Sequence, residues 1–195
     1  QALLGHIGQL PLARSFGLIP RGDFGLGLTN DETAAELARL GFASATASFE
    51  SRLAQIRDLS KPLDLELLVY GRLPLMLMEH CILRNRGQGC HCQDKPQSLG
   101  DRKGEHFPVE SAWGCRNELF NAKPLWLADK TDWRTAGAAY ARLAFLREGP
   151  GECARVFRAY REGAGAPPRA RRIAKEFFRF SRGVRERAPC TMRAR

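Results

Sequence analysis

The sequence contains no apolar run close to the roughly 18 residues that a membrane-spanning helix requires. Its first residues lack the charged, apolar and small-residue regions that together form a secretory signal, so we expect a cytoplasmic protein. No nucleophile elbow accompanies a Ser–His–Asp set, so a serine hydrolase gains little support. The hydrophobic share of 44% is ordinary for a globular protein and can supply a buried core.

The net positive charge is small in the body of the chain and concentrated at its end. The net charge is +10, of which residues 166–195 carry ten Lys/Arg against two Glu. Residues 1–165 are close to neutral, with 21 Lys/Arg against 19 Asp/Glu. The basic tail is able to contact RNA electrostatically, or to serve as a solvated and poorly ordered end.

Strand-like and helix-like segments alternate along the body of the chain. Strands are expected at 18–28, 42–49, 65–70 and 140–146, and helices at 31–40, 50–59 and 150–160. Thr29 and Glu32 resemble a capping box at the start of the first of these helices. Strands separated by short helices predict parallel βα units in an α/β fold, but only about four strands are visible. A closed barrel needs eight, so we expect a partial (β/α) TIM-type barrel or a smaller open sheet.

One segment interrupts this alternation and divides the chain. Residues 79–128 contain turn signals, most of the cysteines and a hairpin expected over 98–109. We interpret them as an inserted Cys-rich lobe on the edge where barrel enzymes keep functional loops. The predicted organisation is barrel units over 1–78, the lobe over 79–128, a returning βα unit over 129–165, and a basic tail over 166–195.

Four of the six cysteines are clustered with the spacing C-x8-C-x-C-x22-C, at Cys81, Cys90, Cys92 and Cys115. This spacing differs from the paired CxxC of a zinc ribbon, so it does not identify the metal. Four thiolates in a loop-rich segment suit a [4Fe–4S] cluster or Zn²⁺. The alternative is a set of reduced, buried thiols. Cys153 lies on an apolar helix stripe and is expected in the core.

Polar residues follow three of the expected strands. Asp23 ends the first, Glu50 follows the second, and Tyr70 with Arg72 follow the third. In a barrel these ends converge on one mouth, where carboxylates serve as acid/base groups and an arginine holds an anion. Each taken singly is also compatible with a solvated loop or a local cap.

Ordered motifs over roughly residues 5–160 resemble the collagenase-like peptidase family U-32. They are Gly5-His6-Ile7-Gly8-Gln9, Gly22-Asp23-Phe24-Gly25-Leu26, Ser48-Phe49-Glu50, Glu66-Leu67-Leu68-Val69-Tyr70-Gly71-Arg72-Leu73-Pro74-Leu75-Met76, Glu79-His80-Cys81, Asp101-Arg102-Lys103-Gly104, Phe107-Pro108-Val109, Cys115-Arg116-Asn117 and Asn121-Ala122-Lys123-Pro124-Leu125. The resemblance implies a (β/α) barrel with an inserted four-cysteine lobe. It also implies a [4Fe–4S] cluster on Cys81, Cys90, Cys92 and Cys115.

The family is catalogued as peptidases, and some members hydroxylate RNA or ubiquinone precursors without oxygen. The resemblance therefore implies either cluster-dependent hydroxylation or a hydrolase with a structural metal, and hydroxylation is the activity we expect. A third alternative is a non-catalytic accessory or RNA-binding fragment. The first strands of the family's barrel are absent from this sequence, so a partner protein that completes the barrel is expected. The substrate remains an unknown protein, RNA or small molecule.

Overall fold

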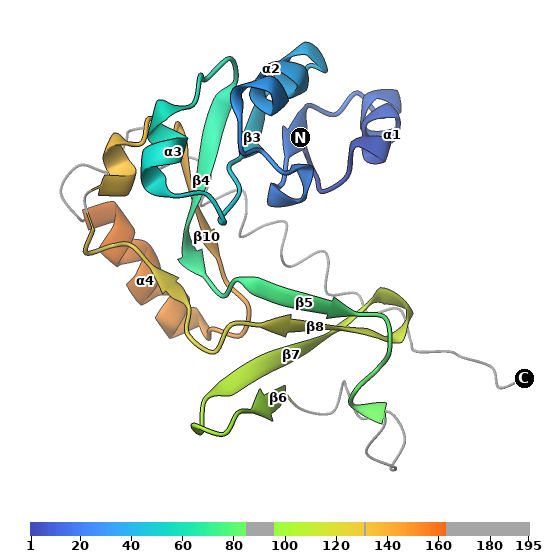
Figure 1. The fold of residues 1–195 in the computed structure, drawn as a ribbon, viewed down its shortest axis with the longest axis vertical. Helices are drawn as coiled ribbons and strands as arrows, with labels where there is room; N and C mark the ends of the chain where they lie inside the picture. The colour runs from blue at the N-terminus through green and yellow to red at the C-terminus, as the bar shows by residue number, and fades with distance from the viewer. Residues whose placement is uncertain (85–95, 131, 163–195) are drawn as a thin grey trace, which may run out of the picture. The chain divides into compact units, whose positions relative to one another are not determined.

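The structure is a computed structural model that describes residues 1–84, 96–130 and 132–162 (Figure 1). Within these residues the chain forms two compact units. The first contains residues 1–71 and the described residues after 125, and the second contains the described residues of 72–125. No helix in the described chain is both long and apolar enough to cross a membrane.

The first unit is built on a parallel sheet with the strand order β1-β2-β3-β4-β10. Its strands are β1 (Ala2–Leu4), β2 (Pro20–Gly22), β3 (Ser44–Thr46), β4 (Asp64–Gly71) and β10 (Tyr140–Ala144). A two-residue strand, β9 (Leu125–Trp126), also pairs with β4. The sheet is open, with β1 and β10 at its edges, so within the described chain it is not a closed barrel. The partial (β/α) barrel stays a prediction.

Four α-helices accompany this sheet: α1 (Leu10–Ser15), α2 (Asp31–Arg39), α3 (Leu53–Asp58) and α4 (Pro150–Glu162). Their buried residues, among them Leu37, Ile56 and Val156, join one hydrophobic core with the odd-numbered residues of β3 and β4. Because side chains alternate across a strand, the even-numbered residues of β3 and β4 lie on the opposite face. That face is polar at Ser44, Thr46, Asp64 and Glu66, while further along β4 it carries the large, buried side chains of Leu68 and Tyr70.

Short 3₁₀ turns, η1 (Ile7–Gln9) and η2 (Phe24–Leu26), follow β1 and β2. His6 Nδ1 accepts from the Gly8 N–H at 3.0 Å, and Gln9 Oε1 accepts from the N–H groups of Gly5 and His6. These bonds satisfy backbone donors that a helix start leaves free. The Gly5–Gln9 motif thus specifies how the chain turns away from β1.

The second unit is an antiparallel sheet with the order β5-β8-β7-β6. Its strands are β5 (Pro74–Met78), β6 (Gln97–Gly100), β7 (His106–Ala112) and β8 (Arg116–Phe120), and a 3₁₀ turn, η4 (Trp113–Cys115), joins β7 to β8. Val109 and Asn117 are its most buried residues, 2% and 1% exposed. The β6–β7 pair confirms the hairpin expected over 98–109. The second unit begins at Arg72, whereas the Cys-rich lobe was expected to begin at residue 79. The difference arises because β5 pairs with β8.

Candidate functional site

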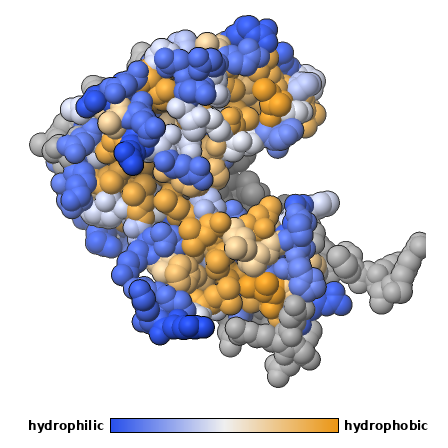
Figure 2. All heavy atoms as spheres, in the orientation of Figure 1, coloured by the Kyte–Doolittle hydropathy of each residue, from blue (hydrophilic) through white to orange (hydrophobic). Residues whose placement is uncertain are grey.

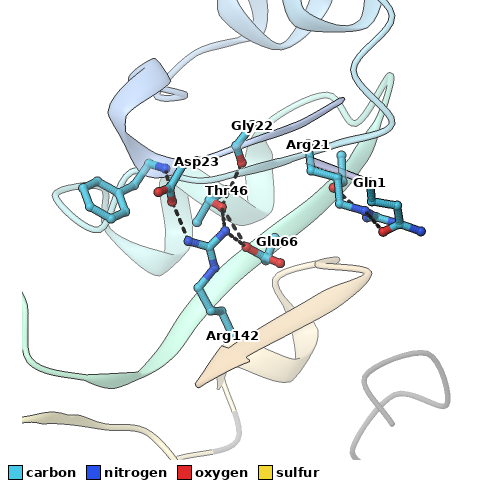
Figure 3. A network of polar contacts seen from close by, with 9 residues as sticks. Gln1, Arg21, Gly22, Asp23, Thr46, Glu66 and Arg142 are labelled. Atoms are coloured by element: carbon cyan, nitrogen blue, oxygen red, sulfur yellow. Dashed lines mark hydrogen bonds and ion pairs between the residues drawn. The ribbon is translucent and has the colours of Figure 1, made fainter. Parts of the chain in front are cut away.

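The polar face of the parallel sheet holds a buried ionic network centred on Arg142 (Figure 3). The Arg142 guanidinium forms ion pairs with Asp23, at 2.5 Å, and with Glu66. Its Nη2 also donates to Thr46 Oγ1 at 2.8 Å. The Thr46 hydroxyl in turn lies 2.8 Å from Glu66 Oε1 and 3.1 Å from the Gly22 carbonyl oxygen. Each member therefore contacts at least one other.

The strand register explains why these residues meet. Thr46 and Glu66 are direct partners on the neighbouring parallel strands β3 and β4. Arg142 pairs with Leu68 on β4, so its side chain reaches back along the same face toward Glu66. Asp23 follows β2 directly and caps η2, where its Oδ1 accepts from the Phe24 N–H at 2.8 Å. Four adjacent strands or strand ends thus contribute one polar side chain each.

Charge and burial together make this network chemically unusual. Thr46, Glu66 and Arg142 are 0%, 6% and 6% exposed, while the Asp23 side chain is 22% exposed. Two carboxylates face one guanidinium, so the set carries a formal charge of −1. Buried charges are tolerated only when they are paired and hydrogen-bonded, as they are here. Asp23 is the member that solvent or a ligand reaches most easily.

A second polar group continues the same face toward the amino ends of the strands. Arg21 donates to Ser44 Oγ at 2.8 Å and to Gln1 Oε1 at 2.7 Å. Its guanidinium stacks over the Tyr140 ring, 5.1 Å from the ring centroid. The Tyr140 hydroxyl donates to Asp64 at 2.9 Å. The polar character of the face therefore extends over two layers of side chains.

The loops that carry Asp23 and Glu50 lie side by side. Their neighbours Phe24 and Phe49 pack edge to face, with ring centroids 5.2 Å apart. Glu50 itself is exposed. The two carboxylates predicted as acid/base candidates thus belong to adjoining loops at the same edge of the sheet, although only Asp23 joins the buried network.

Tyr70, the third predicted site residue, lies in an aromatic cluster. Its ring contacts Trp126, Phe145 and Tyr160 at centroid separations of 5.9, 5.3 and 6.5 Å. Its hydroxyl donates to Glu148 Oε1 at 3.1 Å, and burial, with the nearby Glu148 charge, raises the pKa of this phenol. At neutral pH the phenol is a hydrogen-bond donor, which is the role these contacts require.

Arg72, the predicted anion anchor, belongs to the second unit. Its guanidinium donates to the carbonyl oxygens of Asn121, at 2.9 Å, and of Ala122. The Asn121 N–H donates in turn to the Leu73 carbonyl. These bonds fasten the start of β5 to the chain that follows β8. They give Arg72 a role in holding the sheet together.

Two of the four clustered cysteines lie at the same end of the β5–β8 pair. Cys115 comes immediately before β8, and Cys81 follows β5 by three residues. Met78 pairs with Asn117, so these strand ends are neighbours. The Asn117 side chain accepts from the Ile82 N–H at 2.8 Å, which fastens the chain after Cys81 to β8. The sheet thus directs both cysteine segments to one place.

The described cysteines differ in their state. Cys81 is a buried free thiol, as is Cys153, whose pKa is raised by burial. Cys115 is disulfide-bonded and has a left-handed backbone, with φ of 62°. Cys90 and Cys92 lie outside the described residues. Among the described side chains no three metal-binding residues form a group, so the four-cysteine centre stays a prediction.

Thr46, Glu66 and Arg142 were missed as site candidates in the sequence, although a signal for them is present. Glu66 is a carboxylate between the leucines of the most apolar predicted strand, and Arg142 is a cation inside another strand. A charge inside a buried strand needs a partner, and period-two alternation places it on the face opposite the leucines. Only the register shows that the two charges meet.

Comparison of the chain with protein-family models, with curated proteins and with solved structures found no match.

Proposed function

We propose that this chain is a module of the U-32 type in which Cys81, Cys90, Cys92 and Cys115 bind a [4Fe–4S] cluster. Its proposed activity is oxygen-independent hydroxylation of RNA or of a quinone precursor. When bound, such a cluster supplies one-electron transfer. The observation that carries the proposal is the convergence of the Cys81 and Cys115 segments at one end of the β5–β8 pair.

The two described cysteines, Cys81 and Cys115, supply the donor chemistry of such a centre. Sulfur is the ligand that iron–sulfur clusters use, and Cys81 is already a free thiol. A second sulfur is within bonding distance of Cys115, because Cys115 forms a disulfide. Two-electron reduction of that disulfide, which breaks the S–S bond and gives two thiolates, is needed before Cys115 can serve as a ligand. The cytoplasmic setting that we propose provides reducing conditions.

In this proposal the substrate binds at the parallel sheet, which carries the acid/base residues. In the described chain the helices pack against one face of the sheet, as they do on the outside of a (β/α) barrel, and the opposite face carries the polar residues Ser44, Thr46, Asp64 and Glu66. Asp23 lies where strands end and is the accessible member of the Arg142 network. We assign it the acid/base role, with Glu50 on the adjoining loop as the second candidate. Arg142 and Thr46 position the Asp23 and Glu66 carboxylates.

The proposal includes partners. An open sheet with β1 at one edge supports the expectation that a partner protein completes the barrel. RNA contact through the basic tail, residues 166–195, is the electrostatic complement for an RNA substrate.

The experiment is absorption spectroscopy on full-length chain purified without oxygen. We expect a broad band near about 400 nm from sulfide-to-iron charge transfer. Serine substitution of Cys81, Cys90, Cys92 or Cys115 should remove most of that band. Cys153→Ser is the matched control, because Cys153 is a core residue on α4, and it should leave the band unchanged. A colourless, zinc-loaded chain that cleaves gelatin would support a hydrolase with a structural metal instead.

A further inference from the structure

The outer edge of the second unit exposes three consecutive apolar residues. Leu75, Met76 and Leu77 of β5 are 52%, 55% and 53% exposed. Among the described strands, β5 pairs with β8 alone and is an edge strand of its sheet. Figure 2 shows apolar side chains gathered over β5 and β8 on the face in view. Exposed, apolar edge strands favour pairing with a further strand, because they leave backbone donors and acceptors available.

A row of side chains across this sheet defines the chemistry that such a strand would meet. Leu77, Glu118 and Glu110 are direct partners on β5, β8 and β7, so they share one face. Like charges directly opposite one another are unfavourable. Burial and the Glu110 charge both raise the pKa of Glu118, as expected for two carboxylates held together.

The cation in the next row, Arg116, is not directed at Glu118. Arg116 precedes Glu118 by two residues and shares its face. Its guanidinium is directed away, to Glu79 at 3.3 Å and to the Trp113 carbonyl at 3.0 Å. A segment suited to this edge therefore combines apolar side chains with an added cation.

We propose that residues 176–182 of this same chain, Glu-Phe-Phe-Arg-Phe-Ser-Arg, pair with the free edge of β5 as an additional strand. In an extended segment Phe178 and Phe180 share one face, while Phe177 and Arg179 share the other. Phe178 and Phe180 then pack beside Met76, and Arg179 lies on the face of Glu118. This assignment gives the exposed β5 residues an apolar neighbour and places a cation on the face of Glu118.

Charge complementarity and chain length favour this occupant. Residues 166–195 carry a net +8, and phenylalanines 177, 178 and 180 are their aromatic residues. The last described helix, α4, ends at Glu162. Thirteen residues separate it from Glu176, and they can extend over roughly 45 Å. The assignment concerns the tail and β5, and it stands independently of the iron–sulfur proposal.

The test is hydrogen exchange of the full-length chain, read by mass spectrometry on the peptide that contains residues 74–78. In the wild type we expect slow exchange there, and Arg179→Glu should accelerate it by about tenfold or more. Arg187→Glu is the control, because it makes the same charge change outside the pairing segment. Glu118→Arg combined with Arg179→Glu should restore slow exchange relative to either single variant.

Equal exchange in the wild type, Arg179→Glu and Arg187→Glu would overturn the proposal. So would protection of residues 74–78 that appears only when RNA is added, since RNA rather than the tail would then cover β5. Protection that depends on protein concentration would assign the strand to a second copy and overturn the intramolecular form. The absorption band near about 400 nm should be the same in all five proteins, which separates this test from that of the proposed function.

Discussion

The side-chain oxygen of Asn117 accepts a hydrogen bond from the backbone N–H of Ile82 at 2.8 Å. This bond ties the chain that follows Cys81 to the strand that follows Cys115. Asn117 is 1% exposed, so water cannot replace the bond without local opening. The position of the two cysteine segments therefore depends on one buried amide.

Asn117→Ala should destabilise the chain by about 1–3 kcal/mol, because it leaves the Ile82 N–H without its acceptor. We also expect loss of the absorption band during purification without oxygen. Urea unfolding and absorption spectra measure the two effects. Ser111→Ala is the control, since Ser111 is the exposed cross-strand neighbour of Asn117 and should change stability by less than about 0.5 kcal/mol. Stability equal to that of the wild type in Asn117→Ala would contradict the assigned role.

Arg142→Met should be among the most damaging single substitutions in the parallel sheet. It leaves the Glu66 carboxylate buried without its guanidinium, which typically costs about 3–5 kcal/mol. Adding Glu66→Gln should recover part of that loss, and urea unfolding of the single and double variants measures the coupling. Arg39→Met removes an exposed ion pair with Glu36 and should leave the stability close to that of the wild type. Similar losses in the two single variants would show that the network contributes no more than a surface pair.

Tyr160 should make stability depend on pH in the alkaline range. Burial raises the pKa of Tyr160 from 10.0 to about 12, against a smaller opposing effect of its backbone hydrogen bonds. The folded state keeps the phenol proton more tightly than the unfolded state. The contribution of this protonated phenol to the free energy of unfolding is therefore complete below pH 10 and is lost as the pH rises toward about 12.

Tyr160→Phe should remove the part of the stability loss at alkaline pH that comes from this phenol. It should also lower stability near neutral pH by about 1–3 kcal/mol, because the Leu127 N–H loses its acceptor and the Val69 carbonyl its donor. Urea unfolding between pH 8 and about 11 measures both changes. An unchanged alkaline slope in the variant would contradict the assignment.

Gly71→Ala should disrupt the end of β4. Gly71 has φ of 138°, and an added Cβ would collide with the Ala144 carbonyl oxygen on β10. We expect a loss of about 2 kcal/mol or more in urea unfolding. Gly151→Ala is the matched comparison, since nothing lies within 4 Å of that position in α4, and alanine there should stabilise the helix by about 0.5–1 kcal/mol. Equal effects of the two substitutions would refute the argument from crowding.

Local patterns predicted the elements better than they predicted the site. The apolar run from Leu65 to Tyr70 located β4, and the stripe of Cys153 and Val156 located α4, because burial leaves a local pattern in the sequence. The first long helix begins with a different cap from the Thr29–Glu32 box that we expected. Asn30 caps α2, and its Oδ1 accepts from the Thr33 N–H at 2.9 Å. Thr29 and Asn30 are both good caps, and the sequence did not distinguish them.

The buried network required information that no local pattern contains. Asp23 was predicted because it follows a strand, but its partner Arg142 is 119 residues away in sequence. Their meeting depends on β4 pairing with both β3 and β10, which is a long-range choice of strand order. Tyr70 and Arg72 lie two positions apart in the same sequence motif, yet they belong to two different compact units.

Quantification of iron and acid-labile sulfide tests the central claim most directly. The full-length chain, purified without oxygen, should contain about four iron atoms and about four sulfides, as one [4Fe–4S] cluster requires. Cys81→Ser and Cys115→Ser should each lower both values markedly, while Cys153→Ser should not. A chain that holds zinc without sulfide, or no metal at all, would contradict the account.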